Sequence, residues 1–286
     1  MTKAAKVYFY HSFPRQKDRA LGLRILESIL KKGLLLTAEY KTIRRCSDLC
    51  TKKFLQRRVC FTALTPDKVR SHARKFGSFS FEFDARALRE FGALPALYLS
   101  GRLPNAGMLN QGGEEIARHL LLVHDALRRL WDMHDNGTPR QKRLAVAVLK
   151  KIKPEKKTVQ ELFFTAQTLL NLYYPTDDPK WTGPLGYYEQ REWKITPNLV
   201  YRRKWHYDRL TEQECAELIA LNPDFFGRKI RGKTRASLSF RFAKIGNANV
   251  VASARRLIVP DSLVAKCRRI VKSAGFRISV VGINSL

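Results

Sequence analysis

Two short segments of this chain carry side chains suited to chemistry at a sugar or an amide. His11 and Ser12 stand together at the end of a strand-like segment, where an imidazole and a hydroxyl can present hydrogen bonds to a cleft. Glu192 opens a second strand-like segment directly after a polar turn. A carboxylate in that position can stabilise a developing cation or hold a ribose hydroxyl. Each pattern taken alone also fits an ordinary strand.

Other catalytic patterns are missing from the sequence. His119 and His124 are five residues apart on an expected helix, which splays them, and no CxxC pair accompanies them, so no zinc site is predicted. The sequence also lacks a G-x-S-x-G motif, a P-loop and a G-x-G-x-x-G motif. We therefore expect no metal, and a metal-dependent nuclease is the weakest of the functions considered.

The charge of the chain points to its partner. Lys and Arg number 54 and Asp and Glu 25, which gives a net charge of +29 over 286 residues. A field of this size concentrates polyanions and binds phosphates in a salt-dependent way. We expect a nucleic acid as the partner, with an anionic membrane or a merely basic surface as weaker alternatives.

Basic and aromatic residues occur together in two clusters. Arg and Lys neutralise phosphates, and aromatic rings stack on unpaired bases, so the mixture favours RNA or single-stranded DNA over a duplex. The predicted nucleic-acid contacts are Arg202, Arg203, Lys204, Trp205, Arg228, Lys229 and Arg231, with Phe225, Phe226, Lys233 and Arg235 nearby. A third, purely basic face is expected from Lys150, Lys151, Lys153, Lys156 and Lys157. Each cluster alone also fits a solvated surface.

Cysteine usage and hydropathy indicate the compartment. The five cysteines are an odd, scattered set, which fits a reducing cytosol better than a disulfide framework. No secretory signal opens the sequence, and no apolar run approaches the ~20 residues that span a bilayer. We expect a cytoplasmic protein without a membrane partner.

The order of the expected elements indicates an α+β fold. Residues 6–13 predict a strand and residues 20–32 an amphipathic helix that ends at Gly33. Residues 58–64 predict a second strand. Residues 78–84 alternate strictly, with three phenylalanines on one face, which predicts a half-buried strand. A further strand is expected at residues 96–101.

The middle of the chain changes character. Three helices are expected within an insertion of about 107–184, and strands return at 186–195. The C-terminal part predicts strand, helix and strand at 255–260, 261–274 and 276–283, with Asp261 or Ser262 as the N-cap of the helix. We expect one domain over 1–286, a mixed sheet with an inserted helical subdomain.

These motifs together resemble those of ADP-ribosyltransferase toxins of the diphtheria-toxin-like and DarT-like kind. His11-Ser12, the helix ILESILKKG and the Gln190-Arg191-Glu192 turn carry the resemblance. It implies an ADP-ribosyltransferase-like sheet core, NAD as substrate, and Glu192 as the catalytic carboxylate with Gln190 facing the acceptor. It also implies NAD contacts by His11, Ser12 and Thr62, and Tyr98 is a candidate by strand position.

The blocks RVCFTALTP, GSFSFEFD, GALPALYL, YYEQREWKI and RRLIVPDSLVAKCRRIVKSAGF resemble those of AbiGi-like abortive-infection proteins of bacteria. This second resemblance implies a role in phage defence with an antitoxin partner. The leading hypothesis is an NAD-dependent ADP-ribosyltransferase toxin that modifies nucleic acid. The alternative is a non-catalytic nucleic-acid-binding antitoxin or regulator, because AbiGi-like proteins have been labelled antitoxins.

Overall fold

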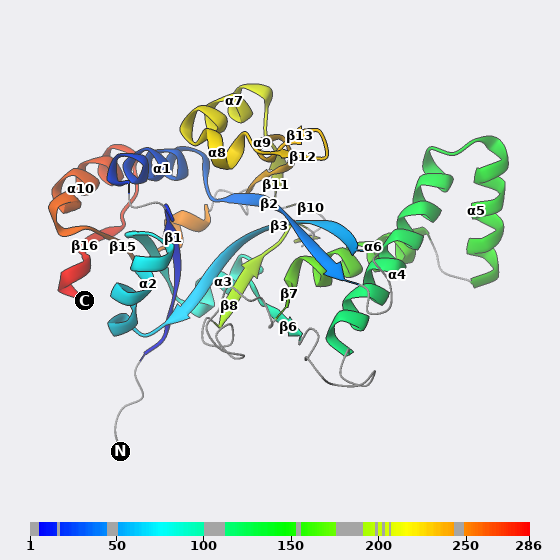
Figure 1. Ribbon diagram of the computed structural model, residues 1–286, viewed down its shortest axis with the longest axis horizontal. Coiled ribbons are helices and arrows are strands. Elements are labelled where there is room, and N and C mark those ends of the chain that lie inside the picture. Colours follow the sequence, from blue (N-terminus) through cyan, green and yellow to red (C-terminus); the bar gives the residue numbers. More distant parts are fainter. Residues whose placement is uncertain are drawn as a thin grey trace, which may run out of the picture. The chain divides into compact units, whose positions relative to one another are not determined.

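The chain folds into a mixed β-sheet with helices packed on it, an organisation compatible with the expected α+β class (Figure 1). The computed structural model describes residues 6–15, 18–44, 51–99, 112–152, 156–175, 191–197, 200–201, 204–205, 207–242 and 249–286.

The central sheet has ten strands. They are β1 (Tyr8–Phe13), β2 (Leu35–Arg44), β3 (Thr51–Leu64), β4 (Phe79–Phe83), β5 (Leu94–Pro95), β8 (Glu192–Ile195), β11 (Tyr207–Arg209), β14 (Phe240–Phe242), β15 (Arg256–Val259) and β16 (Ser279–Gly282). The order is β11-β14-β2-β3-β1-β4-β15-β16, while β8 pairs with β3 and β5 pairs with β8. The sheet is mixed because β15 and β16 are parallel.

Short strand pairs and helices complete the fold. The pairs are β6 (Leu97–Leu99) with β7 (Tyr173–Pro175), β9 (Val200–Tyr201) with β10 (Lys204–Trp205), and β12 (Lys229–Ile230) with β13 (Lys233–Thr234). The α-helices are α1 (Arg19–Lys32), α2 (Val69–Phe76), α3 (Ala85–Glu90), α4 (Gly112–Asp135), α5 (Pro139–Ile152), α6 (Lys156–Leu172), α7 (Glu212–Leu221), α8 (Pro223–Phe226), α9 (Arg235–Leu238) and α10 (Val264–Ser273). The 3-10 helices are η1 (Pro66–Lys68), η4 (Val250–Ser253), η5 (Asp261–Leu263) and η6 (Ile283–Ser285).

The predicted opening of strand, bend, helix and glycine is confirmed. The Asp18 side chain accepts a hydrogen bond from the Leu21 amide and caps α1 at its N-terminus. Gly33 ends the helix with a φ of 91°, a conformation that side chains other than glycine rarely adopt. The apolar stripe of α1, which includes Leu26 and Ile29, is buried.

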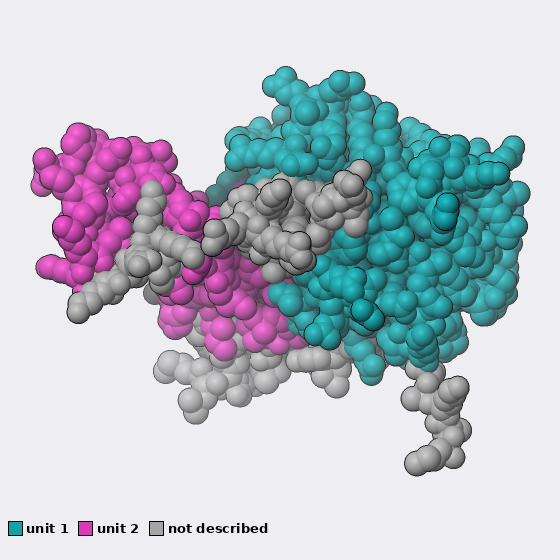
Figure 2. Space-filling view, turned by 180° about the vertical axis from the view of Figure 1, so that it is seen from behind, with its two compact units in different colours: residues 1–39, 57–96, 187–286 teal, residues 40–56, 97–186 magenta. Residues whose placement is uncertain are grey.

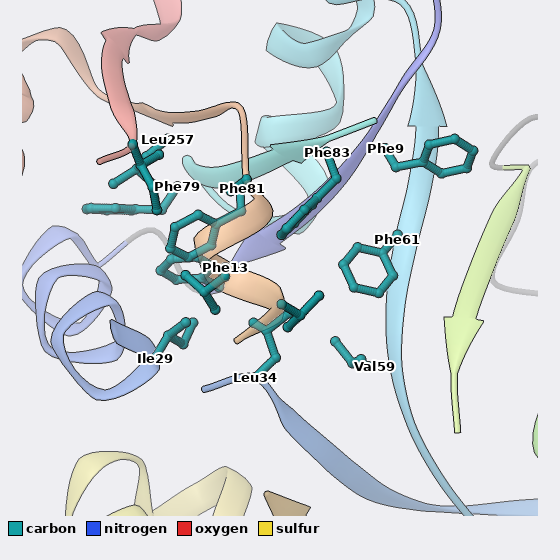
Figure 3. Close-up of a cluster of buried hydrophobic side chains, with 14 of the residues drawn as sticks. Phe9, Phe13, Ile29, Leu34, Val59, Phe61, Phe79, Phe81, Phe83 and Leu257 are labelled. Carbon is teal, nitrogen blue, oxygen red and sulfur yellow. The ribbon is translucent and has the colours of Figure 1, made fainter. Parts of the chain in front are cut away.

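Phenylalanine side chains from three strands form the main core on one face of the sheet (Figure 3). Phe13 of β1 stacks on Phe79 of β4, with ring centroids 5.7 Å apart, and Phe61 of β3 meets Phe83 edge-on at 5.4 Å. Burial of large rings in such geometries stabilises a core by more than area alone. Helices α1, α3 and α10 contribute apolar side chains to the same cluster.

The strand at residues 78–84 forms, but it is not half-buried as its alternation predicted. All five residues of β4 are buried. The reason is that β4 lies between β1 and β15 in the sheet, and its second face carries a polar network instead of meeting solvent. Glu82 accepts a hydrogen bond from the Tyr10 hydroxyl at 2.8 Å and a bidentate pair from Arg256 at 2.8 and 2.7 Å.

The capping role expected for Asp261 or Ser262 is wrong. Residue Pro260 occupies the N-cap of η5, and Leu263 that of α10, in both cases without a side-chain cap. The Asp261 carboxylate instead accepts a hydrogen bond from the Asn284 side chain at 2.7 Å. It thereby ties η5 to η6.

The chain divides into two compact units (Figure 2). Unit 1 consists of residues 1–39, 57–96 and 187–286, and unit 2 of residues 40–56 and 97–186. Helices α4, α5 and α6, which correspond to the expected insertion, belong to unit 2 together with the first residues of β3. Unit 2 is therefore larger than 107–184, because it also includes residues 40–56, 97–106 and 185–186.

Candidate active site

The two segments singled out by their chemistry lie on either side of one strand. Strand β3 pairs with β1 from Tyr8↔Leu64 to Tyr10↔Thr62, and it pairs with β8 through Thr62↔Glu192. Thr62 therefore pairs with Tyr10 of β1 and also with Glu192 of β8. His11, Ser12, Thr62 and Glu192 thus lie on adjacent strands of unit 1, although the chain separates them widely.

His11 reaches from β1 to the backbone of β3. Its Nδ1 lies 3.0 Å from the carbonyl oxygen of Cys60. A carbonyl oxygen only accepts, so Nδ1 carries the proton and Nε2 is left as an acceptor. Burial lowers the pKa of His11, partly offset by this hydrogen bond, and the ring is therefore neutral at pH 7.

Ser12 faces β4. Its hydroxyl lies 2.7 Å from the hydroxyl of Ser80, which is its partner in the β1–β4 register. Either oxygen can donate. One of the two hydroxyl protons is used in the bond between the serines, and the other can be donated to a further acceptor. A sugar or amide oxygen is a suitable acceptor.

Glu192 is held at the very start of β8. Its backbone carbonyl accepts a hydrogen bond from the Ala96 amide at 2.8 Å. The preceding Arg191 has a φ of 41°, in the left-handed region that few residues other than glycine occupy. Strain of this kind is found at functional turns, where the surrounding structure holds it in place. Gln190 lies outside the described residues.

Cationic and polar side chains surround the Glu192 carboxylate. The side chain of Glu192 is only 12% exposed, and its Oε2 lies 3.5 Å from Nζ of the fully buried Lys194. The Cys60 thiol lies close enough to this carboxylate for the Glu192 charge to act on it. Burial and the neighbouring Glu192 charge raise the pKa of Cys60 to about 12, so this thiol is not a nucleophile at neutral pH.

Arg58 of β3 is a further polar side chain in this buried region. It is buried, and its guanidinium pairs with the Glu39 carboxylate at 2.5 Å. Sequence reasoning missed Arg58, Cys60 and Lys194. The signal that could have found them is alternation, because polar residues occupy every second position from Arg58 to Thr62 and from Glu192 to Lys194.

The strand register assigns His11 and Glu192 to different faces of the sheet. Residues directly opposite each other share a face, so Glu192 lies with Thr62 and Tyr10. His11 follows Tyr10, and its ring lies 5.8 Å from Phe61 on the core face. The resemblance implies that His11 and Glu192 face the same NAD molecule, whereas the register places their side chains on opposite faces of the sheet.

Tyr98 lies in unit 2. It pairs with Tyr174 in the β6–β7 register, and the two rings are 6.2 Å apart. Its predicted contact with NAD stays a prediction, because the site described above belongs to unit 1.

The predicted nucleic-acid contacts are only partly described. Arg202 and Arg203 lie outside the described residues, and Lys204 and Trp205 form β10, whose backbone pairs with β9. Arg228, Lys229 and Arg231 are exposed on and beside the β12–β13 hairpin of unit 1.

No protein-family model, curated protein or solved structure matches this chain. Within the described ranges, no group of three or more His, Cys, Asp or Glu side chains is arranged to hold a metal ion. In the same part of the chain, none of the helices is both long and apolar enough to cross a membrane.

Proposed function

We propose that this chain is an NAD-dependent ADP-ribosyltransferase that modifies nucleic acid, RNA or single-stranded DNA, on an ADP-ribosyltransferase-like sheet. One observation carries the proposal: β3 pairs with β1 through Tyr10↔Thr62 and with β8 through Thr62↔Glu192, so the segments that hold His11 and Glu192 flank the same residue of one strand. The resemblance of the same segments to diphtheria-toxin-like transferases supports it. The +29 charge supports a nucleic acid as the acceptor.

In this mechanism NAD is a substrate. The bond between C1′ of the nicotinamide ribose and the pyridine nitrogen breaks, and nicotinamide leaves with the electron pair. The Glu192 carboxylate stabilises the positive charge that develops on the ribose. A base nitrogen of the acceptor then forms the new bond to C1′ and releases its proton to solvent. By the resemblance to that family, Gln190 is proposed to face the acceptor.

The neutral state of His11 suits a role in binding. Its Nδ1–H is held by the Cys60 carbonyl, so Nε2 is available to accept a hydrogen bond from a ribose hydroxyl. A neutral ring also avoids repulsion of the cationic ribose. Ser12 and Thr62 supply hydroxyls on the face of the sheet that carries Glu192.

The proposed biological setting follows from the resemblance to AbiGi-like abortive-infection proteins. A transferase of this kind acts as a toxin in bacterial phage defence and requires an antitoxin protein to restrain it. A reducing cytoplasm fits the scattered cysteines.

A non-catalytic nucleic-acid-binding protein is the second candidate. The observation that favours it is the strand register, which assigns the His11 and Glu192 side chains to different faces. In that case the buried Glu192–Lys194 pair stabilises the fold, and the basic surface alone carries the function.

The deciding experiment uses NAD labelled in its adenylate phosphate. The wild-type protein is incubated with RNA or single-stranded DNA, and label in the nucleic acid is measured. Glu192→Gln is expected to lower the transfer by roughly 100-fold or more, because the carboxylate charge is lost. Glu27→Gln removes the same charge from the exposed surface of α1 and serves as the control.

Two outcomes would contradict the transferase. Absence of label with every acceptor would leave the binding protein as the function. Equal transfer by Glu192→Gln and the wild type would remove Glu192 from the reaction. Circular dichroism of each variant shows whether a loss of transfer reflects a loss of fold.

A further inference from the structure

The β12–β13 hairpin ends in a tight basic tip. Ile230 pairs with Lys233 across a two-residue loop, and both loop residues have positive φ, 49° for Arg231 and 78° for Gly232. This is the geometry of a type I′ turn, whose twist matches that of the strands. A side chain at Gly232 would meet no atom within 4 Å, so the tip projects into open space.

The hairpin concentrates positive charge. Residues 228–235 contain five cationic and no acidic side chains: Arg228, Lys229, Arg231, Lys233 and Arg235. The first four are exposed. Like charges so close together repel one another, which destabilises the free hairpin unless a polyanion neutralises them.

An exposed aromatic ring adjoins this charge. Phe225 of α8 is 39% exposed, and the guanidinium carbon of Arg235 lies 4.2 Å from its ring centroid. Phe226 meets Phe225 edge-on at 4.9 Å. The Phe225 amide donates to the Asn222 side chain, which caps the short helix and fixes the position of the ring.

One backbone contact joins the two features. The Arg235 amide donates to the Arg228 carbonyl at 2.9 Å, so the base of the hairpin and the Phe225–Arg235 pair form one local structure. An exposed phenyl ring held beside a planar guanidinium is a platform for the face of a base. A duplex hides those faces, whereas a single strand exposes them.

We propose that Phe225, Arg235 and the β12–β13 hairpin form the site that binds a single-stranded nucleic acid. A base stacks on the Phe225–Arg235 pair, and the exposed cations Lys229, Arg231 and Lys233 contact the flanking phosphates. The inference deepens the proposed function by assigning its acceptor to one element. It does not require catalysis, because the binding surface lies on residues outside the Glu192 site.

The test measures binding without NAD. Fluorescein-labelled 12-residue oligo(U) and oligo(dT), and a duplex of the same length, are titrated by fluorescence anisotropy at several salt concentrations. Phe225→Leu keeps an apolar side chain but removes the aromatic face. It is expected to weaken single-strand binding by about 5- to 100-fold, the range for one base stack, and to leave duplex binding unchanged. Phe225→Tyr restores the affinity.

A charge-matched pair of variants tests the hairpin. Lys229→Gln with Lys233→Gln removes two exposed cations from the hairpin, and Lys266→Gln with Lys272→Gln removes two from the exposed surface of α10. The hairpin variant is expected to reduce the slope of log Kobs against log salt by about 1.4, from 0.7 per phosphate contact on a single strand. The α10 variant retains the wild-type slope.

Equal effects of the hairpin and α10 variants would overturn the inference, as would competition by poly-glutamate at the same charge concentration as oligo(U). Unchanged single-strand affinity in a folded Phe225→Leu variant would also overturn it. Failure of the transferase assay alongside hairpin-dependent binding would reject only the enzymatic proposal. If the Lys229→Gln, Lys233→Gln variant transferred label from NAD to the nucleic acid at the wild-type rate, only the hairpin site would be rejected.

Discussion

His11 and Glu192 contact the same residue, Cys60, from two directions. The His11 ring meets the Cys60 carbonyl at the point where β1 and β3 end their pairing, and the Glu192 carboxylate meets the Cys60 thiol from β8. The backbone of Cys60 therefore binds His11, and its side chain lies beside Glu192. Its environment offers direct tests of the geometry.

The first prediction concerns alkylation of Cys60. A thiol pKa of about 12 in place of 9.0 reduces the thiolate fraction at pH 8 by about 1000-fold. Iodoacetamide should therefore modify Cys60 far more slowly in the native protein than in urea, as measured by peptide mass spectrometry. Glu192→Gln removes one cause of the raised pKa and should accelerate the reaction, while Cys215 reacts at an unchanged rate in the same digest. Rapid native alkylation would refute the buried contact.

The second prediction concerns the buried Lys194–Glu192 pair. Lys194→Met leaves the Glu192 carboxylate without its cation and should lower the free energy of unfolding by about 3 kcal/mol. The double variant Lys194→Met, Glu192→Gln should recover most of this loss, because neither charge remains. Urea denaturation of the wild type, the two single variants and the double variant gives the four free energies of unfolding that this double-mutant cycle compares.

A surface pair provides the control for that cycle. Arg86 and Glu90 form an i,i+4 pair at 3.2 Å with both side chains largely exposed. The corresponding cycle with Arg86→Met and Glu90→Gln should give a coupling below about 0.5 kcal/mol. Equal couplings for the two pairs would show that Lys194 is not buried against Glu192.

The third prediction concerns the polar network on β4. Tyr10→Phe removes one hydrogen bond to Glu82 and should cost about 1 kcal/mol of stability. Glu82→Leu leaves the Arg256 guanidinium without its bidentate partner and should cost more, about 3–5 kcal/mol. Thermal and urea unfolding give the comparison, and a smaller loss for Glu82→Leu than for Tyr10→Phe would contradict the network.

The fourth prediction concerns acid stability. Burial, with repulsion from Arg15 and Lys75, lowers the pKa of His72 from 6.5 to about 4. Between these values the unfolded chain binds a proton that the native protein does not, so stability rises with pH in this window. Acidification from pH 7 to pH 4 should therefore lose roughly 3 kcal/mol through this group.

The His72 contribution is separated from other titrations by a matched variant. The ring of His72 stacks on Phe76 at 4.4 Å, and His72→Phe keeps an aromatic ring there. Urea denaturation of both proteins at pH 7.5, 5.5 and 4.5 should show the steeper loss in the wild type. Parallel losses would mean that His72 is protonated in the native state.

The sequence predicted individual strands and helices, but it did not predict which distant segments pack against them. The alternation of Phe79, Phe81 and Phe83 indicates a strand and its apolar face, but only the position of β4 between β1 and β15 explains why Ser80 and Glu82 are buried too. Burial of a second face depends on partners from distant segments, such as Arg256. Local periodicity contains no information about them.

The same limit applies to the candidate site. His11, Thr62 and Glu192 could be selected by residue type and resemblance, and the pairing of β1 and β8 with β3 brings them together. Their assignment to faces depends on strand register, which a shift of one residue would reverse. Lys194 reads as an ordinary surface lysine in the sequence, because its burial results from the packing of β3 and β5 on either side of β8.

The division of unit 1 into residues 1–39, 57–96 and 187–286 has a consequence for synthesis of the protein. During translation, β1 and β3 emerge from the ribosome long before β8, so the nascent chain holds His11 while the glutamate that completes the site has not yet been made. Closing such long loops slows folding and delays the native pairing of β3 with β8. If the chain is a toxin, its producing cell is protected from it until β8 has been made and has paired with β3.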